Sequence, residues 1–261
     1  MKWSFIVLII VLQCCSCDYS HRQNNNSKEI VKVSIDTPSI SRKTDSINLS
    51  LSLQSSLIYT ATEQHIIDAG LTDIKTIDSN IVVDLKYSTD DNFLGFDIYG
   101  AFNKCYLQPD VAKKLKGAQL LLKSRFPYYN LIVYDAVRPL RIQYKMWDNI
   151  KVPYTERSKY LSNPKNGSLH NFGAAVDLSI IDENEYDLDM GTPYDYFGEL
   201  AYPREEERMI KEGKLTRLQL LNRKILRDVM QEAGFMGITT EWWHFNSCSR
   251  NEAFSKYKII E

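Results

Sequence analysis

The sequence predicts an α+β fold, a single domain built around a small sheet. Two observations lead to this prediction. Short apolar stretches typical of strands alternate with stretches of helical apolar spacing, and the connections between them are short. In addition, 261 residues with 44% hydrophobic side chains are enough to bury one core.

The first predicted elements are a strand over 81–88 (IVVDLKYS), a turn-rich segment (TDDNFLG) and a helix over 110–126. The helix is predicted because its apolar residues recur every three or four positions. These residues are Val111, Leu115, Ala118 and Leu122.

The middle of the domain combines two strands with one helix. Residues 130–137 (NLIVYDAV) predict a buried strand that ends at Arg138 and Pro139, and 141–150 predict a helix. Another strand is predicted over 174–181.

A long helix over 215–235 and a β-rich segment over 238–246 (ITTEWWHFN) complete the domain. Gly234 suits the C-cap of this helix. The face expected to pack on the core consists of Leu218, Leu221, Ile225 and Val229.

Residues 1–17 (MKWSFIVLIIVLQCCSC) resemble a bacterial lipoprotein signal peptide. The apolar run is too short to span a bilayer, which needs about 20 residues. Ser16 before Cys17 favours Cys17 as the lipidated residue, and Leu12 leaves Cys15 open. An ordinary cleaved secretory signal is the alternative. Both predict an exported protein, and a lipoprotein would lie in the periplasm or cell envelope, held to the membrane only by its lipid.

Residues 18–57 are rich in Ser, Asn and Thr and predict a flexible tether, so that the folded domain covers 58–261. Outside the signal, the cysteines are Cys105 and Cys248. Export permits a disulfide between them, and two free thiols are the alternative. The net charge of −1 and the dispersed Lys and Arg give no electrostatic case for nucleic acid. No protein partner is implied.

The segment GSLHNFGAAVDLSI (167–180) places His170 and Asp177 on either side of Gly173. Two ligands of one zinc ion lie only a few ångströms apart, whereas seven residues of straight helix or strand separate Cα atoms by about 10 Å or more than 20 Å. A turn at Gly173 would bring the two side chains together. Strand alternation then puts Asp177 on the face opposite Val176. A buried Asp needs a partner, which could be a metal or a structural turn network.

The segment TEWWHF adds Glu241 and His244 three residues apart. A further His ligand and a nearby non-ligand carboxylate fit a catalytic zinc site. Because residues three apart on a strand face opposite sides, a bulge or a departing loop is required. The alternative is a Trp-rich core strand with an incidental His. Arg138 follows a buried strand and could stabilise an oxyanion, although Arg-Pro is also a common turn.

Together these motifs resemble the zinc D-alanyl-D-alanine dipeptidases, which are related to D,D-carboxypeptidases and to the Hedgehog fold. The resemblance covers Asp78 to Phe245 and includes VDLKYSTDDNFLG and MGTPYD. The motifs are Ser168-x-His170-x-x-Gly173-x-Ala175-x-Asp177, Glu241-x-x-His244, and Arg138 in DAVRP.

The resemblance implies a small, mainly antiparallel central sheet flanked by helices, and one Zn²⁺ bound by His170, Asp177 and His244. Glu241 would be the general base, and Arg138 would hold the oxyanion. The substrate-binding residues would be Tyr87 and Asp195, for the free ammonium of a dipeptide, and Ser168, for its carboxylate.

The implied reaction is hydrolysis of D-Ala-D-Ala or a similar short dipeptide containing D-amino acids. Alternatives are a D,D- or L,D-carboxypeptidase acting on longer peptidoglycan stems, and a non-catalytic zinc-binding module. Ala101 departs from the family pattern, in which an aromatic residue is expected. The fit around the C-terminal side of the substrate is therefore open.

Overall fold

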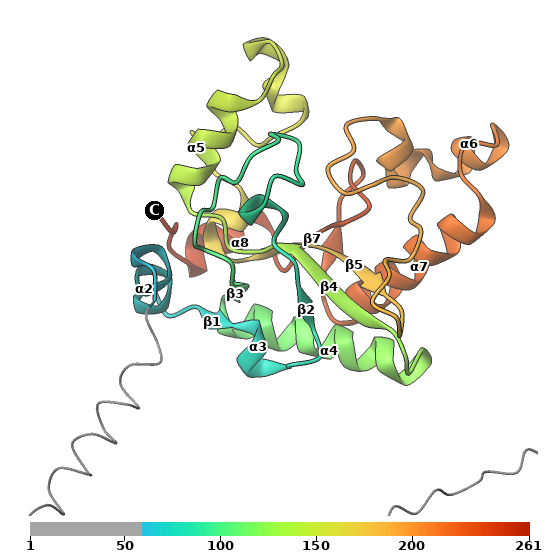
Figure 1. Cartoon of the computed structure of the whole chain (residues 1–261), viewed down its shortest axis with the longest axis horizontal. Helices are drawn as coiled ribbons and strands as arrows, with labels where there is room; N and C mark the ends of the chain where they lie inside the picture. The colour runs from blue at the N-terminus through green and yellow to red at the C-terminus, as the bar shows by residue number, and fades with distance from the viewer. Residues whose placement is uncertain (1–58) are drawn as a thin grey trace, which may run out of the picture. The chain divides into compact units, whose positions relative to one another are not determined.

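A computed structural model of the chain describes residues 59–261 (Figure 1). Its helices are α2 (Ala61–Asp68), α3 (Ile74–Ile77), α4 (Pro109–Arg125), α5 (Leu140–Asn149), α6 (Glu206–Lys211), α7 (Arg217–Glu232) and α8 (Arg250–Lys256). Its strands are β1 (Thr72–Asp73), β2 (Val82–Val83), β3 (Tyr106–Leu107), β4 (Asn130–Asp135), β5 (Ala175–Ile181), β6 (Met236–Gly237) and β7 (His244–Asn246).

The central sheet has the strand order β2-β4-β5-β7-β6. β2 runs parallel to β4, and the other three pairings are antiparallel. A separate pair joins β1 to β3. The predicted α+β fold with a small, mainly antiparallel sheet is therefore confirmed. The first predicted strand is much shorter than 81–88, because Lys86–Ser88 turn into a 3-10 helix that buries Tyr87.

The core lies between the sheet and the helices α4 and α7, which pack on each other. Figure 1 shows α4 running alongside β4. The predicted apolar face of α4 is confirmed, since all four of its residues are fully buried. From β5, alternation sends Val176, Leu178 and Ile180 into this core. Asp177 and Ser179 consequently face the other side of the sheet, where the polar side chains gather.

The predicted apolar face of α7 is wrong in its first half. Leu218 and Leu221 are 63% and 52% exposed, while Asn222 and Arg223 are buried. The segment 189–201 covers this part of the helix with backbone carbonyls, and these two polar side chains donate hydrogen bonds to them. In its first half the helix therefore points hydrogen-bond donors at this segment. The second half of the predicted face is confirmed, since Ile225 packs partly buried against the core and Val229 is fully buried.

β4 contains a β-bulge that changes the direction of one carboxylate. Val133 pairs with Leu178, but Asp135 pairs with Asp177, so the register shifts by one residue between Val133 and Asp135. Without the bulge, Asp135 would lie opposite Val176 and face the apolar core. With it, Asp135 shares the polar face with Asp177.

Three of the sequence-based predictions concern the N-terminal segment and the two remaining cysteines. The predicted signal peptide, Cys17, the tether and its boundary at residue 58 all lie outside the described residues. Cys105 and Cys248 are free thiols, which is the second of the two predicted alternatives. Within 59–261, no helix combines the length and apolarity needed to cross a membrane.

Candidate active site

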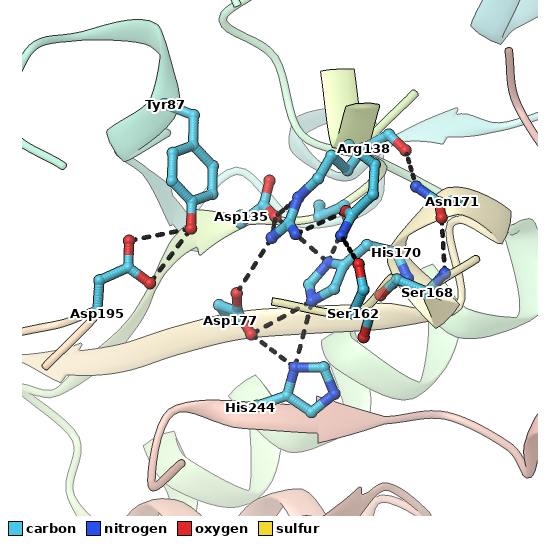
Figure 2. A network of polar contacts seen from close by, with 12 residues as sticks. Tyr87, Asp135, Arg138, Ser162, Ser168, His170, Asn171, Asp177, Asp195 and His244 are labelled. Atoms are coloured by element: carbon cyan, nitrogen blue, oxygen red, sulfur yellow. Dashed lines mark hydrogen bonds and ion pairs between the residues drawn. The ribbon is translucent and has the colours of Figure 1, made fainter. Parts of the chain in front are cut away.

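Three potential metal ligands meet on the polar face of the sheet (Figure 2). His170 comes from the 3-10 helix Leu169–Phe172, Asp177 from β5, and His244 from the first position of β7. Asp177 and His244 are direct cross-strand partners. Three atoms face one another and form what we call the donor triangle: His170 Nε2, Asp177 Oδ1 and His244 Nδ1. His244 Nδ1 lies 2.9 Å from Asp177 Oδ1 and 3.2 Å from His170 Nε2, and the two remaining atoms are 3.3 Å apart. Donors on a tetrahedral zinc with bonds near 2.05 Å would stand about 3.3 Å apart.

The tautomers of both histidines favour a cation between them. His170 Nδ1 lies 2.7 Å from Ala136 O, and His244 Nε2 lies 2.9 Å from Asn246 Oδ1. Both oxygens only accept hydrogen bonds, so these two nitrogens carry the protons. When both imidazoles are neutral, the opposite ring nitrogens therefore present lone pairs to each other and to the Asp177 carboxylate. A divalent cation bound between them would be coordinated by all three atoms of the donor triangle, so the residues present fit a metal ion.

Charge in this cluster shifts two pKa values. Burial by itself raises the pKa of Asp177, but the two imidazoles beside it hold that pKa well below its usual range. Burial by itself lowers the pKa of His244, but the hydrogen bond and charge of Asp177 outweigh it and raise the pKa to about 9. A proton and a metal therefore compete for the same nitrogen of His244.

Gly173 makes the turn that brings His170 to Asp177, as predicted. Its φ is 64°, in the left-handed region that favours glycine. A Cβ at this position would lie 2.7 Å from Leu71 Cδ2. Ser168 begins the turn, and Asn171 Oδ1 accepts a hydrogen bond from the Ser168 backbone N–H at 2.6 Å. The turn is thus specified both by its conformation and by the space around it.

Glu241 leaves the line of β7 through a loop, which is one of the two predicted solutions to its spacing from His244. His244 is the first residue of the strand, and Glu241 lies in the preceding segment with Oε2 3.9 Å from His244 Nδ1. Burial raises the pKa of Glu241, although the positive charge of His244 opposes this. A carboxylate with a raised pKa, next to but outside the donor triangle, suits proton transfer.

Arg138 lies at the same site, held by Asp135. Its Nε donates to Asp135 Oδ2 at 2.9 Å, NH2 donates to the same oxygen, and NH1 donates to Gln143 Oε1 at 3.0 Å. The NH2 atom lies 3.8 Å from Asp177 Oδ2. A guanidinium has five N–H donors, so the remaining ones can point into the site without giving up these anchors.

Tyr87 and Asp195 are brought together from positions 108 residues apart. Tyr87 OH donates to Asp195 Oδ2 at 2.9 Å. Asp195 has a φ of 57°, an unusual conformation that tends to occur at functional sites. Burial, together with the charge of Asp177, raises the pKa of Asp195 well above its usual range. A carboxylate in this condition is ready to accept a cationic partner such as an ammonium.

The segment that carries Asp195 is fastened at both ends by one buried side chain. Arg223 Nε donates to Met190 O at 2.7 Å, and its NH2 donates to Leu200 O at 2.9 Å. Trp242, next to Glu241, donates to Thr192 Oγ1 at 2.8 Å. The segment that carries Asp195 and the loop that carries Glu241 are therefore linked.

Every site residue predicted from the sequence, except Cys17, lines a single cavity of about 220 Å³. Larger cavities exist elsewhere among the described residues, but none contains the donor triangle. Sequence reasoning missed Asp135, Tyr194, Asn246 and Arg250. Asp135 carried a signal, a carboxylate at the end of a buried strand three residues before Arg138. Tyr194, whose OH donates to Asp177 Oδ2 at 3.0 Å, carried none.

Comparison with known proteins agrees with this geometry. Residues 67–258 match the Peptidase M15 family, described as D-Ala-D-Ala dipeptidase. The chain belongs to the D-Ala-D-Ala dipeptidase family. It is 31% identical over 181 residues to the D-alanyl-D-alanine dipeptidase of Escherichia coli (strain K12), covering 67% of this chain and 83% of that protein. The D-alanyl-D-alanine dipeptidase of Enterococcus faecium is 27% identical over 194 residues, which cover 68% of this chain and 91% of the relative.

Membership of the dipeptidase family makes this chain a metallopeptidase, and the cluster of His170, Asp177 and His244 is a group that could hold its metal ion. The matched segment contains the whole cavity, from Tyr87 to Arg250. The individual roles of Glu241, Arg138, Ser168, Tyr87 and Asp195 remain predictions.

Proposed function

We propose that this protein is a zinc-dependent dipeptidase that hydrolyses D-Ala-D-Ala or a similar short dipeptide containing D-amino acids. The observation that supports this proposal is a single cavity of about 220 Å³, which is lined by the three potential metal ligands, by Glu241 and by the hydrogen-bonded pair Tyr87 and Asp195. Ligand pockets for drug-sized molecules are usually about 300–1,000 Å³, so a smaller cavity suits a small dipeptide.

The catalytic steps are assigned to residues of the cavity. A zinc ion held by His170, Asp177 and His244 would supply Lewis-acid polarisation of the scissile carbonyl and a more acidic water. Glu241 accepts a proton from the attacking water and delivers it to the leaving amine, so the proton is conserved over the reaction. Arg138 donates hydrogen bonds to the carbonyl oxygen as negative charge develops there.

Tyr87 and Asp195 orient the substrate by its amino end. The Asp195 carboxylate pairs with the free ammonium, and Tyr87 holds that carboxylate in place. A substrate with a blocked amino end would leave the carboxylate buried without a cation, which is costly. This requirement separates a dipeptidase from a carboxypeptidase that trims long stem peptides.

The deciding experiment compares hydrolysis of D-Ala-D-Ala with that of N-acetyl-D-Ala-D-Ala by the zinc-loaded protein, before and after chelation. Chelator-sensitive cleavage with a strong preference for the free dipeptide is expected. Preference for the acetylated substrate would favour the carboxypeptidase alternative. One bound zinc without cleavage of either substrate would favour the non-catalytic binding module.

The proposal also includes export of the protein from the cytoplasm. The N-terminal sequence supports secretion as a lipoprotein anchored through Cys17, so the enzyme would meet cell-wall dipeptides in the periplasm or cell envelope. Metabolic labelling with a fatty acid should mark the wild-type chain and leave the Cys17→Ser variant unlabelled. A labelled variant would point to Cys15 instead.

A further inference from the structure

The cavity carries an additional cation that the catalytic assignments leave unused. Arg250, at the start of α8, lines the same cavity as the donor triangle and Ser168. Arg138, the other arginine of the cavity, is paired with Asp135 and lies near Asp177. In the part of the chain that the structure describes, Arg250 has no carboxylate within ion-pair distance.

Arg250 is nevertheless held in place. Its NH2 atom donates to the backbone carbonyls of Asn166 and Gly167, the latter at 3.2 Å. Its guanidinium carbon lies 5.6 Å from the centroid of the Phe254 ring. Because Gly167 directly precedes Ser168, these contacts hold the guanidinium beside the turn that positions His170.

The anchored guanidinium retains donors for a ligand. NH2 alone makes the two carbonyl contacts, and among the described residues Nε and NH1 make no hydrogen bond. Nε–H and an NH1 N–H form a planar fork that matches a carboxylate bidentately. An anchored arginine of this kind loses less side-chain entropy on binding than a freely rotating one.

The charges of the cavity are arranged for a zwitterion. Asp195 and Tyr87 supply a negative, hydrogen-bonded site, whereas Arg250 supplies an unpaired positive charge next to Ser168. A free dipeptide carries an ammonium at one end and a carboxylate at the other.

We propose that Arg250 is a specificity-determining residue that binds the C-terminal carboxylate of the substrate beside Ser168. This inference rests on the proposed dipeptidase function and narrows its substrate class to short peptides with both termini free. A peptide extended or amidated at its C-terminus would leave Arg250 without an anion and would gain nothing from this contact. Arg250 thus determines which substrates bind, while Glu241 and Arg138 act at the peptide bond that is hydrolysed.

The test pairs one substitution with one change in the substrate. Steady-state kinetics of the zinc-loaded wild type, Arg250→Ala and Arg250→Lys are measured with D-Ala-D-Ala and with its C-terminal amide. A charge-assisted hydrogen bond at a solvent-exposed position supports an expected effect of about tenfold. For D-Ala-D-Ala, KM should rise about tenfold in Arg250→Ala with kcat unchanged, because the lost contact binds ground state and transition state alike.

The amide should bind wild type and Arg250→Ala equally weakly. Arg250→Lys should recover part of the loss, since it keeps the charge without the planar fork. Arg217→Ala is the matched control, because Arg217 is an exposed arginine of α7 outside the cavity. Its KM should equal that of the wild type. Thermal unfolding of each variant checks that the fold is intact.

A binding measurement separates this inference from the proposed function. In the Glu241→Gln background, which slows turnover, calorimetry gives the Kd of D-Ala-D-Ala with and without Arg250→Ala. Equal Kd values, or an equal loss for the dipeptide and its amide, would overturn the role of Arg250 while leaving the dipeptidase proposal standing. Wild-type protein that fails to cleave D-Ala-D-Ala would overturn the proposed function, and the Kd comparison would still decide on Arg250.

Discussion

Replacing Asp195 with asparagine should make the protein more stable and less active. Asparagine preserves the shape of the side chain and tolerates the positive φ of 57° at this position. It removes the negative charge that accepts the substrate ammonium, and Tyr87 OH can still donate to the amide oxygen. The substitution therefore isolates the charge from the geometry.

The expected loss of activity follows from the lost charge pairing. Hydrogen bonds to charged groups contribute about 1.5–3 kcal/mol, and 1.4 kcal/mol corresponds to a tenfold change. We expect kcat/KM for D-Ala-D-Ala to fall by about 10- to 100-fold in Asp195→Asn. Substrates that lack the ammonium should be hydrolysed no more slowly by the variant than by the wild type.

The stability effect has a defined pH dependence. Burial and the charge of Asp177 raise the pKa of Asp195 in the folded protein well above its value of about 3.9 in an unfolded chain. Between these two pKa values the folded protein binds a proton that the unfolded chain has released. The free energy of unfolding of the wild type therefore falls as the pH rises through this interval, and the full cost is present above it. The asparagine side chain cannot ionise, so the Asp195→Asn variant does not lose stability in this way as the pH rises.

The assay is thermal unfolding of both proteins between about pH 4 and about pH 8, after the metal has been removed with a chelator. This range begins near the pKa of Asp in an unfolded chain. The melting temperature of Asp195→Asn should exceed that of the wild type at neutral pH, and the difference should shrink toward pH 4. Asp228→Asn, at an exposed salt bridge of α7, is the control for loss of one negative charge. A pH-independent difference, or a less stable Asp195→Asn, would refute the reasoning that burial makes this carboxylate costly.

Three further predictions concern the general base, the metal ligand His244 and the segment 189–201 that carries Asp195. Glu241→Gln should keep its metal by elemental analysis and lose about 10²- to 10⁴-fold in kcat, and near-normal turnover would remove Glu241 from the mechanism. His244→Ala should lose metal, so a normal zinc stoichiometry would contradict its role as a ligand. Arg223→Met should raise KM several-fold without changing metal content, because Met190 and Leu200 lose their donor. An unchanged KM would show that the segment 189–201 keeps its conformation without the hydrogen bonds from Arg223.

The sequence predicted the parts of the site whose geometry is local. Gly173 between His170 and Asp177 implied a turn, and alternation along 175–181 assigned Asp177 to the polar face. Both are properties of neighbouring residues, and sequence spacing describes them well. The first half of the predicted α7 face was wrong for the opposite reason, since distant backbone carbonyls decide which side chains are buried there.

By itself, then, the sequence determined the fold class, the chemical types in the site and the two motifs that hold the metal ligands. Tertiary structure alone decided how Asp135 faces, because the bulge in β4 moves it from the core side to the side of Asp177. It also decided that Tyr194 contacts Asp177 and that Arg250 reaches the cavity of His170. Pairing register and long-range contacts depend on which strands and loops become neighbours, and one chain read in order does not contain that distance information.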